Sequence, residues 1–166
     1  YHPDQRAALR KAARAELGLS DDVFLFLFVG SGFWRKGLDA AIGALVASGN
    51  AKLHLAVAGR DRDSARYAAL AETAGLGARM RLLGARDDVR PLYAAADCLL
   101  LPTRYDPFPN TALEALAMGL PAIVGRRSGA AEILQAGRNG WICDPGDVPG
   151  LAQLLREAAA ASGDNH

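Results

Sequence analysis

The sequence predicts an α/β fold, a parallel sheet of about six strands with helices on both faces. Two observations lead to this prediction. Short apolar runs alternate along the chain with longer segments of helical periodicity, and the links between them are short. The runs are apolar throughout, as in VFLFLFV at Val23–Val29 and CLLL at Cys98–Leu101, which is typical of parallel strands buried on both faces. Ligands of such sheets bind beyond the carboxyl ends of the strands, so the residues that follow each strand are the candidates for a site.

Each element has its own start and stop signals. The first helix is rich in Ala and Arg over Asp4–Leu17, and Gly18 ends it. The helix expected at Lys36–Ala47 carries apolar residues at helical spacing, and Gly49-Asn50 follows as a stop. The other expected helices are Asp63–Thr73, Asp87–Ala95, Asn110–Met118, Ala130–Ala136 and Val148–Ala161, before a polar tail at Ser162–His166. The expected strands are Val23–Val29, Leu53–Ala58, Met80–Leu83, Asp97–Leu101, Pro121–Val124 and Gly140–Cys143.

The length of 166 residues fits one domain, or one half of a larger protein. Apolar residues make up 51% of the chain, enough for a sizeable core. A net charge of +1 at pH 7 gives no broad electrostatic footprint for nucleic acid, and no apolar run is long enough to span a membrane. The chain opens at Tyr1 without a methionine. We therefore expect a fragment of a longer protein and leave an upstream targeting segment open.

The cysteines and histidines do not suggest a metal site. Cys98 and Cys143 each lie in an apolar segment with no second ligand at metal-binding spacing, so we expect buried structural thiols. His2, His54 and His166 are far apart in the sequence and suggest no zinc site.

The stretch VGSGFWRKG, Val29–Gly37, closes the first strand with a glycine-rich turn. It begins like a dinucleotide-binding fingerprint, but Arg35 occupies the place of the third glycine. A helix starting at Lys36 would present free amides and a positive dipole end, and two cations lie beside it. The stretch therefore favours a phosphate-bearing ligand. The alternative is a solvated Arg-Lys pair on glycines that serve only the turn.

The stretch TRYDPFPNTALEALAMGLP, Thr103–Pro121, carries two carboxylates eight residues apart. Asp106 lies in the loop after a strand, and Glu114 lies in the following helix, for which we expect Asn110 as N-cap. Both carboxylates can then face one cleft, with free helix amides between them. That arrangement suits a sugar nucleotide, since carboxylates hydrogen-bond hydroxyls and amides bind the diphosphate. Taken alone, Glu114 is also an ordinary charge near a helix start, and Asp106 an ordinary turn residue before proline.

These stretches resemble the motifs of the retaining GT-B glycosyltransferases of glycosyltransferase family 4, group 1. D-PFPNTAL-E followed by ALAMGLPAIV is similar to the E-x7-E motif and the Gly-x-Pro strand after it. VGSGFWRKGLDAAIGAL looks like the strand-to-Lys-Gly element, and SGAAEILQAGRNGWICDPGD is similar to the tail of the family pattern. The form Gly-Ser-x-Phe-x-Arg-Lys-Gly looks most like the lipopolysaccharide core enzymes that place glucose on the first heptose. The resemblance runs from about Val23 to Leu155.

The resemblance implies a Rossmann-like domain, the C-terminal half of a GT-B fold, over residues 1–166, with the N-terminal acceptor-binding domain absent. The implied protein is a bacterial hexosyltransferase that moves a hexose, with glucose from UDP-glucose favoured, to a saccharide or lipopolysaccharide-core acceptor. It would retain configuration, need no metal or other cofactor, and be inactive without its N-terminal half. We expect it in the cytoplasm, at the inner face of the cytoplasmic membrane if its missing half associates there peripherally. No histidine lies in a motif as a base, so the acceptor proton would pass to the departing phosphate oxygen.

The resemblance also assigns roles to residues. Lys36 would contact the donor diphosphate and stabilise the leaving group, Asp106 would lie beside the donor sugar, and Glu114 would hold the ribose hydroxyls. Arg60 and Leu83 lie where the base is usually held. The expected catalytic residues are Lys36 and Asp106, and the expected substrate-binding residues are Gly30, Ser31, Arg35, Arg60, Leu83, Phe108, Pro109, Asn110, Thr111 and Glu114.

Three residues depart from the family pattern. Asp106 replaces the usual glutamate, and Pro109 replaces a glycine, which removes one amide donor; both changes leave the identity of the sugar open. Ser31 stands where many members carry an arginine. A second cation for the diphosphate must then come from elsewhere, with Arg35, Arg104 and Arg6 as candidates.

Two other functions stay open from the sequence alone. One is half of a dinucleotide-dependent oxidoreductase, against which Arg35 and the lack of an acid at the end of the second strand both speak. The other is a non-catalytic nucleotide-binding module, because Lys36 and Glu114 indicate binding capacity rather than turnover. The segment Asp61-Arg62-Asp63 matches a metal-binding Asp-x-Asp motif of a different glycosyltransferase architecture, and we interpret Asp63 as a helix N-cap.

Overall fold

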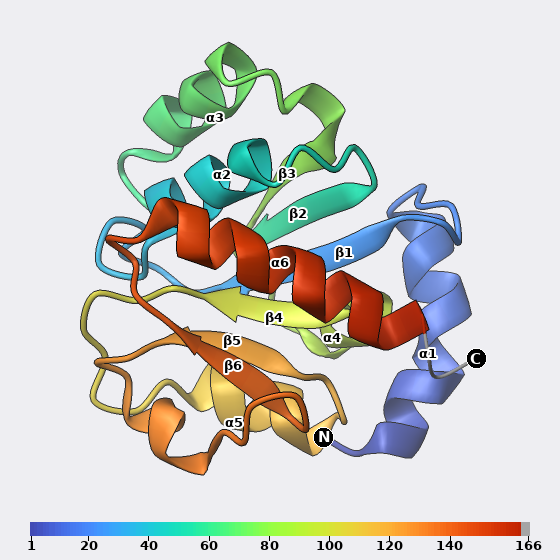
Figure 1. Ribbon diagram of the computed structural model, residues 1–166. Coiled ribbons are helices and arrows are strands. Elements are labelled where there is room, and N and C mark those ends of the chain that lie inside the picture. Colours follow the sequence, from blue (N-terminus) through green and yellow to red (C-terminus); the bar gives the residue numbers. More distant parts are fainter. Residues whose placement is uncertain (164–166) are drawn as a thin grey trace.

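The computed structural model describes residues 1–163 and contains one six-stranded parallel sheet (Figure 1). The strand order is β3-β2-β1-β4-β5-β6. The strands are β1 (Phe24–Val29), β2 (Leu53–Ala58), β3 (Met80–Gly84), β4 (Cys98–Leu101), β5 (Ala122–Gly125) and β6 (Gly140–Cys143). All six predicted strands are therefore confirmed, and so is the parallel sheet. Among the described residues no helix is both long and apolar enough to cross a membrane.

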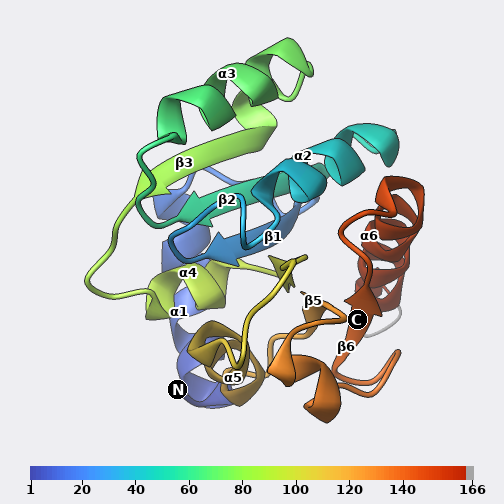
Figure 2. The same ribbon diagram turned by 90° about the vertical axis from the view of Figure 1, so that its left-hand side faces the viewer.

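Helices cover both faces of the sheet, as predicted. The helices are α1 (Pro3–Glu16), α2 (Leu38–Ala47), α3 (Ser64–Thr73), α4 (Arg90–Ala95), α5 (Asn110–Ala117) and α6 (Val148–Gly163). Figures 1 and 2 show α2, α3 and α6 on one face and α1, α4 and α5 on the other. The buried strands between these layers form the apolar core; Phe26, Leu27 and Phe28 of β1 are fully buried. Helices cover the side chains on both faces of the sheet, which explains why the strand sequences are apolar without interruption.

The order of the strands creates a switch point between β1 and β4 at the carboxyl edge of the sheet. The chain passes outward from β1 to β2 and β3, then returns to place β4 on the other side of β1. The connection after β1 therefore leads to one face and the connection after β4 to the other. Such a switch point is where ligands bind in open α/β sheets. Figure 2 views the molecule from this edge, to which the carboxyl ends of the strands point.

Several predicted helix boundaries are wrong. The helix expected from Lys36 begins at Leu38, because Gly37 has a positive φ of 79° and ends the turn before it. A side chain at Gly37 would overlap the carbonyl oxygen of Pro102, so this position needs glycine. The helix expected from Asp87 begins at Arg90. That expected at Ala130–Ala136 is a short 3₁₀ turn at Gly129–Ile133 (η2), and another such turn, η1 (Gly77–Arg79), precedes β3.

The predicted N-caps are also wrong in part. Asn110 is the first residue of α5, and Pro109 occupies the N-cap position before it. Asp63 does precede α3, but its side chain makes no capping hydrogen bond. At the other end of the chain α6 continues to Gly163, so the polar tail expected from Ser162 starts inside a helix. The rest of that tail, residues 164–166 with His166, lies outside the described residues.

Cys98 and Cys143 are buried and unpaired by disulfides, as predicted. Burial raises the pKa of both thiols, that of Cys143 to about 12, so both are protonated and unreactive near neutral pH. Within residues 1–163 no group of three or more His, Cys, Asp or Glu side chains is placed to hold a metal ion.

Candidate functional site

The loop after β1 is anchored at both of its ends. Its first residue, Gly30, donates its amide to the Ala58 carbonyl oxygen of β2 at 2.9 Å. Phe33 is buried between Phe28 and Tyr67, with ring centroids 5.8 and 5.5 Å away. The Phe33 amide donates to Asp61 Oδ2 at 2.8 Å. These contacts fix the loop on β2 and on the segment after it.

Asp61 therefore has a structural role that the sequence does not reveal. Its other oxygen, Oδ1, accepts the amide of Asp63 at 2.9 Å. The two amides, that of Asp63 first and that of Phe33 second, lower the pKa of the Asp61 carboxyl. The acidic segment Asp61-Arg62-Asp63 thus joins two loops by backbone contacts, and its aspartates do not converge on a metal site.

Lys36 points inward from this loop to Asp106. Its Nζ donates to Asp106 Oδ2 at 3.0 Å, and both residues are buried, at 8% and 7% exposure. A β-carbon on Gly30 would lie 2.6 Å from Lys36 Cε, so glycine is required where the lysine stem crosses the backbone. The Lys36 amide is not free, as a helix start would require, because it donates to the Gly32 carbonyl oxygen at 3.0 Å. The predicted attraction for an anion at this place must come from the ammonium group.

Arg35 lies on the same carboxylate. Its Nη1 is 3.2 Å from Asp106 Oδ2 and 3.0 Å from the Tyr105 carbonyl oxygen. Two cations against one carboxylate leave one positive charge in excess. Because Lys36 and Asp106 are shielded from water, that charge is screened less than at the surface. The cluster of Arg35, Lys36 and Asp106 is therefore suited to an anionic ligand.

The loop after β4 is fastened to the loop after β1 by Arg104. The Arg104 amide donates to the Arg35 carbonyl oxygen at 2.9 Å, and its guanidinium lies 4.8 Å from the centre of the Trp34 ring. Two further hydrogen bonds, of 2.9 and 2.7 Å, join the same guanidinium to both oxygens of Asp39 on α2. The hydrogen bonds to Asp39 raise the pKa of Arg104. Arg104 is thus held by Asp39 and fixes the distance between the two loops.

The segment around Asp106 is held on its other side by the loop after β5. Asp106 forms an isolated parallel bridge with Ser128, and its carbonyl oxygen accepts the Gly129 amide at 3.1 Å. A side chain on Gly129 would overlap the Pro107 carbonyl oxygen. Backbone contacts from two neighbouring loops therefore fix the position of the Asp106 carboxylate.

Helix α5 carries the second predicted carboxylate, Glu114. Glu114 is half-buried, and its Oε2 accepts the hydroxyl of Tyr93, on α4, at 2.9 Å. The first turn of α5 presents the amides that have no partner inside the helix, although Pro109 before it has none to give. The Thr111 Oγ1 atom is buried and has no hydrogen-bond partner among the described residues.

The remaining predicted residues lie on the same edge of the sheet. Arg60 is exposed after β2 and lines a hollow of about 430 Å³ together with Gly32 and Arg35. Leu83 is half-buried near the end of β3. The side chain of Phe108 is 44% exposed, and Ser31 is exposed. Hydrogen bonds and ion pairs join Arg35, Lys36 and Asp106, and the Lys36 stem crosses Gly30; the other predicted residues share this edge of the sheet.

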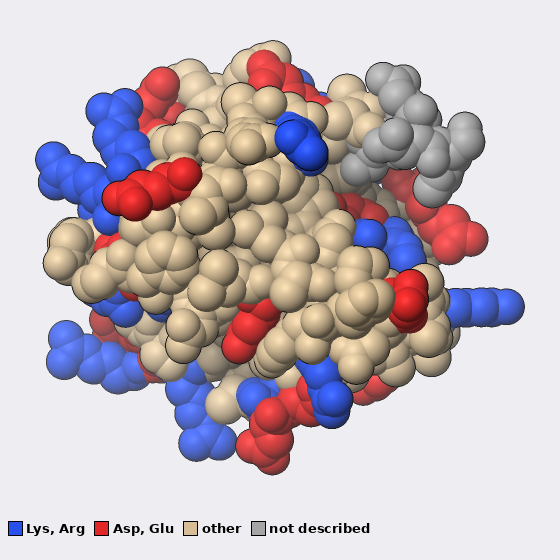
Figure 3. Space-filling model, turned by 90° about the horizontal axis from the view of Figure 1, so that it is seen from below, with Lys and Arg blue, Asp and Glu red and all other residues tan. Residues whose placement is uncertain are grey.

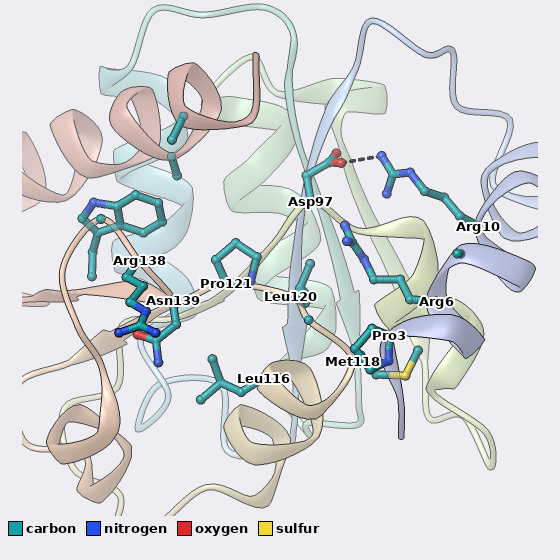
Figure 4. A pocket seen from close by; sticks show the side chains of 16 residues that line it. Pro3, Arg6, Arg10, Asp97, Leu116, Met118, Leu120, Pro121, Arg138 and Asn139 are labelled. Carbon is teal, nitrogen blue, oxygen red and sulfur yellow. Dashed lines mark hydrogen bonds and ion pairs between the residues drawn. The ribbon is translucent and has the colours of Figure 1, made fainter. Parts of the chain in front are cut away.

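Arg6 was a wrong candidate for the second cation. It lies on α1 at the opposite edge of the sheet, where its Nη2 donates to the Ala96 carbonyl oxygen at 3.0 Å. Figure 4 shows it beside Arg10 and Asp97, in a hollow of about 650 Å³ at the amino ends of the strands. Arg10 and Arg14 share the Asp97 carboxylate at 2.5 and 3.2 Å, and so fasten α1 to the sheet.

The charge distribution agrees with an anionic ligand at the carboxyl edge. In Figure 3 Lys and Arg side chains gather along the left-hand side of the molecule, the direction in which the strands point. Arg126 and Arg127, after β5, line a hollow of about 600 Å³ with Arg35, Arg104 and two exposed aromatic side chains, Trp34 and Tyr105. The net charge of the whole chain is only +1, so this concentration of cations is local.

Comparison with known proteins decides the family. The model of the family described as glycosyl transferases group 1 matches residues 10–164. This chain belongs to that family. The match excludes the dinucleotide-dependent oxidoreductase that the sequence had left open.

Two curated glycosyl transferases are similar over nearly the whole chain. LpsE of Rhizobium meliloti, a lipopolysaccharide core biosynthesis glycosyltransferase, is 31% identical over 147 residues, which are 89% of this chain and 43% of LpsE. The lipopolysaccharide glucosyltransferase WaaG of Escherichia coli is 34% identical over 157 residues, 92% of this chain and 42% of WaaG. The chain thus spans less than half the length of these relatives.

Solved structures confirm the fold. A crystal structure of WaaG superposes with a TM-score of 0.86 at 31% identity, covering 98% of this chain and 46% of that one. HepE of Anabaena, solved in complex with UDP and glucose, gives a TM-score of 0.79 at 24% identity, covering 98% of this chain and 44% of HepE. The Rossmann-like sheet therefore matches one half of GT-B glycosyltransferases, as predicted.

Proposed function

We propose that this chain is the donor-binding half of a retaining hexosyltransferase that uses a nucleotide sugar. The observation that carries the proposal is the cluster of Arg35, Lys36 and Asp106 at the switch point of the sheet. Membership of the group 1 family supplies the class of reaction. In this proposal each part of the donor is assigned to one feature of the site.

The diphosphate would bind at the cluster. Lys36 and Arg35 share one carboxylate oxygen, so an arriving phosphate can replace part of that contact without a large movement of either cation. The first-turn amides of α5 lie at the same edge and favour an anion through their unpaired N–H groups. The Asp106 carboxylate is then available to hydroxyls of the donor sugar, and Glu114 to those of the ribose.

The proposed chemistry follows from the charge of the leaving group. Departure of the nucleoside diphosphate builds negative charge on its phosphate oxygen, and Lys36 would stabilise that charge. A fixed cation in a shielded site can serve in place of a metal ion, so we propose metal-independent transfer. The bond between the anomeric carbon and the diphosphate oxygen would break, and the acceptor oxygen would bond to that carbon on the same face and pass its proton to the departing oxygen. Attack on the face from which the diphosphate departs retains the configuration.

The identity of the donor is proposed from the relatives. WaaG is named a glucosyltransferase, and HepE, which shares the fold, binds UDP and glucose. We therefore propose UDP-glucose as donor and a saccharide of the lipopolysaccharide core as acceptor, with transfer on the cytoplasmic side of the membrane. The acceptor would be held by an N-terminal domain of a longer protein; the relatives are about twice as long as this chain.

Titration calorimetry on the 166-residue chain tests the proposal. UDP, GDP and ADP, each free and as the glucose conjugate, are titrated with EDTA and again with manganese. We expect one nucleotide, UDP, to bind in EDTA with unchanged affinity. Binding that requires manganese would contradict the metal-independent site, and absence of binding by all three would contradict donor binding altogether.

A further inference from the structure

Glu114 has a hydrogen-bond partner on a neighbouring helix. Tyr93 of α4 is fully buried, and its hydroxyl lies 2.9 Å from Glu114 Oε2. The carbonyl oxygen of Thr111 is a second acceptor at 3.2 Å. A phenol has one proton to donate. The carboxylate is the nearer and the charged acceptor, so it receives the stronger hydrogen bond.

This contact is built into the core. Buried tyrosines place their hydroxyl against a polar partner, because an unpaired one is costly. Burial, and then the charge of Glu114, raises the pKa of Tyr93, so the hydroxyl stays a donor across the physiological range. Tyr93 is fully buried, so its ring cannot follow a moving carboxylate.

The outer side of Glu114 is different. The exposed Tyr1 packs edge-on against Tyr93, with ring centroids 5.9 Å apart. Partial burial, the nearby charge of Glu114 and a hydrogen bond to the Glu114 side chain raise the pKa of the Tyr1 phenol. Tyr1 is exposed and can move aside when a ligand reaches Glu114, whereas Tyr93 is fully buried.

We propose that Tyr93 is the positioning residue for Glu114. Its hydroxyl holds one carboxylate oxygen inward and so turns the other toward the ribose hydroxyls of the donor. A glutamate side chain on a helix otherwise samples several rotamers, and fixing it before the ligand arrives lowers the entropy lost on binding. The inference rests on the proposed function, since it presumes that Glu114 binds ribose.

The test uses Tyr93→Phe, which keeps the ring and removes only the hydroxyl. Calorimetry compares UDP with 2′,3′-dideoxy-UDP on the folded chain, with GDP and ADP pairs as further probes. We expect Tyr93→Phe to weaken UDP roughly tenfold, the scale of one hydrogen bond to a charged group, and to change dideoxy-UDP less than about twofold. A general loosening of the site would weaken both nucleotides alike, so the difference reports on positioning.

Two comparisons complete the design. Ser48→Ala removes another buried hydroxyl, which donates to the Leu45 carbonyl oxygen at 2.6 Å at the end of α2, and should change neither nucleotide. In a Glu114→Ala background, Tyr93→Phe should have no further effect on UDP, because it acts through the missing carboxylate. A further loss there would overturn the inference, and so would equal weakening of UDP and dideoxy-UDP by Tyr93→Phe.

The outcomes separate the inference from the proposed function. If Glu114→Gln lowers affinity for UDP but not for dideoxy-UDP, while Tyr93→Phe leaves both unchanged, the ribose role stands and the positioning role is wrong. If Glu114→Gln affects the two nucleotides equally, the ribose role is wrong and the positioning role falls with it. Circular dichroism and thermal unfolding of every variant show whether the fold is kept.

Discussion

Replacement of Lys36 by alanine tests the centre of the proposed mechanism. Lys36 is 8% exposed, and its ammonium is 3.0 Å from a buried carboxylate. If it stabilises charge that grows on the leaving diphosphate, its loss should lower turnover more than donor affinity. Removal of one preorganised electrostatic contact costs about 3–4 kcal/mol in the transition state, a few hundredfold in rate.

The structure also predicts how the fold responds. Removing one partner of a buried ion pair can cost about 3–5 kcal/mol when the other charge is left alone. Here Arg35 stays 3.2 Å from Asp106, so the carboxylate keeps a cation and we expect a loss of only about 1–2 kcal/mol. Lys36→Ala should therefore fold, which chemical denaturation checks before any kinetics are interpreted.

The assay is steady-state transfer by this chain joined to its acceptor-binding half. Lys36→Met keeps the apolar stem over Gly30 and removes only the charge, so it should lose as much turnover as Lys36→Ala. Lys36→Arg should rescue only in part, because a planar guanidinium does not replace a compact ammonium where Gly30 leaves so little room. Arg35→Ala, at an exposed side chain, should cost less. Near-normal turnover of folded Lys36→Met would refute the catalytic role.

Three further predictions concern the site and its supports. Glu114→Gln should weaken UDP binding by about 1–3 kcal/mol through loss of charge-assisted hydrogen bonds, while the control Glu132→Gln should weaken it less. If calorimetry gives Glu114→Gln the same affinity for UDP as the unchanged chain, the ribose assignment is wrong. Arg104→Lys should lower the melting temperature and donor affinity together, since lysine cannot contact both Asp39 oxygens and the Trp34 ring; Arg90→Lys, in an exposed pair with Asp88, is the matched control and should change neither. Gly30→Ala should destabilise the chain more than Gly18→Ala in urea, because both positions have positive φ but only Gly30 meets another side chain.

The sheet was predictable from the sequence because each strand is a local apolar run with its own stop signal. Lys36 and Asp106 were predicted as candidates because each lies in a loop that follows a strand at the edge where ligands bind, and Glu114 because it lies in the helix after the second of these loops. The start of α2 was not, since the positive φ of Gly37 depends on the Pro102 carbonyl in a distant loop. Arg6 was a wrong candidate for a similar reason: its sequence neighbours do not reveal that α1 lies at the opposite edge.

The supports of the site were missed because they are side-chain contacts between distant segments. Arg104 and Asp39 are 65 residues apart, and Tyr93 and Glu114 are 21 apart. The chain has 19 Lys and Arg and 18 Asp and Glu, so periodicity alone cannot say which cation pairs with which acid. Only the packing of the layers selects these partners.

The contacts that hold the Lys36 and Asp106 loops in place explain how a site made of loops can act electrostatically. A charge stabilises a transition state best when it is held in place before the reaction, since reorienting it would use up the gain. The Lys36 loop is fixed by Asp61 and by the buried Phe33, and the Asp106 loop by Arg104 and by Gly129. Asp106 in turn holds Lys36 and Arg35 at 3.0 and 3.2 Å. In this interpretation Asp106 keeps the two positive charges of Lys36 and Arg35 together near the diphosphate position. When the phosphate binds these cations in its place, the Asp106 carboxylate can accept a hydrogen bond from a sugar hydroxyl.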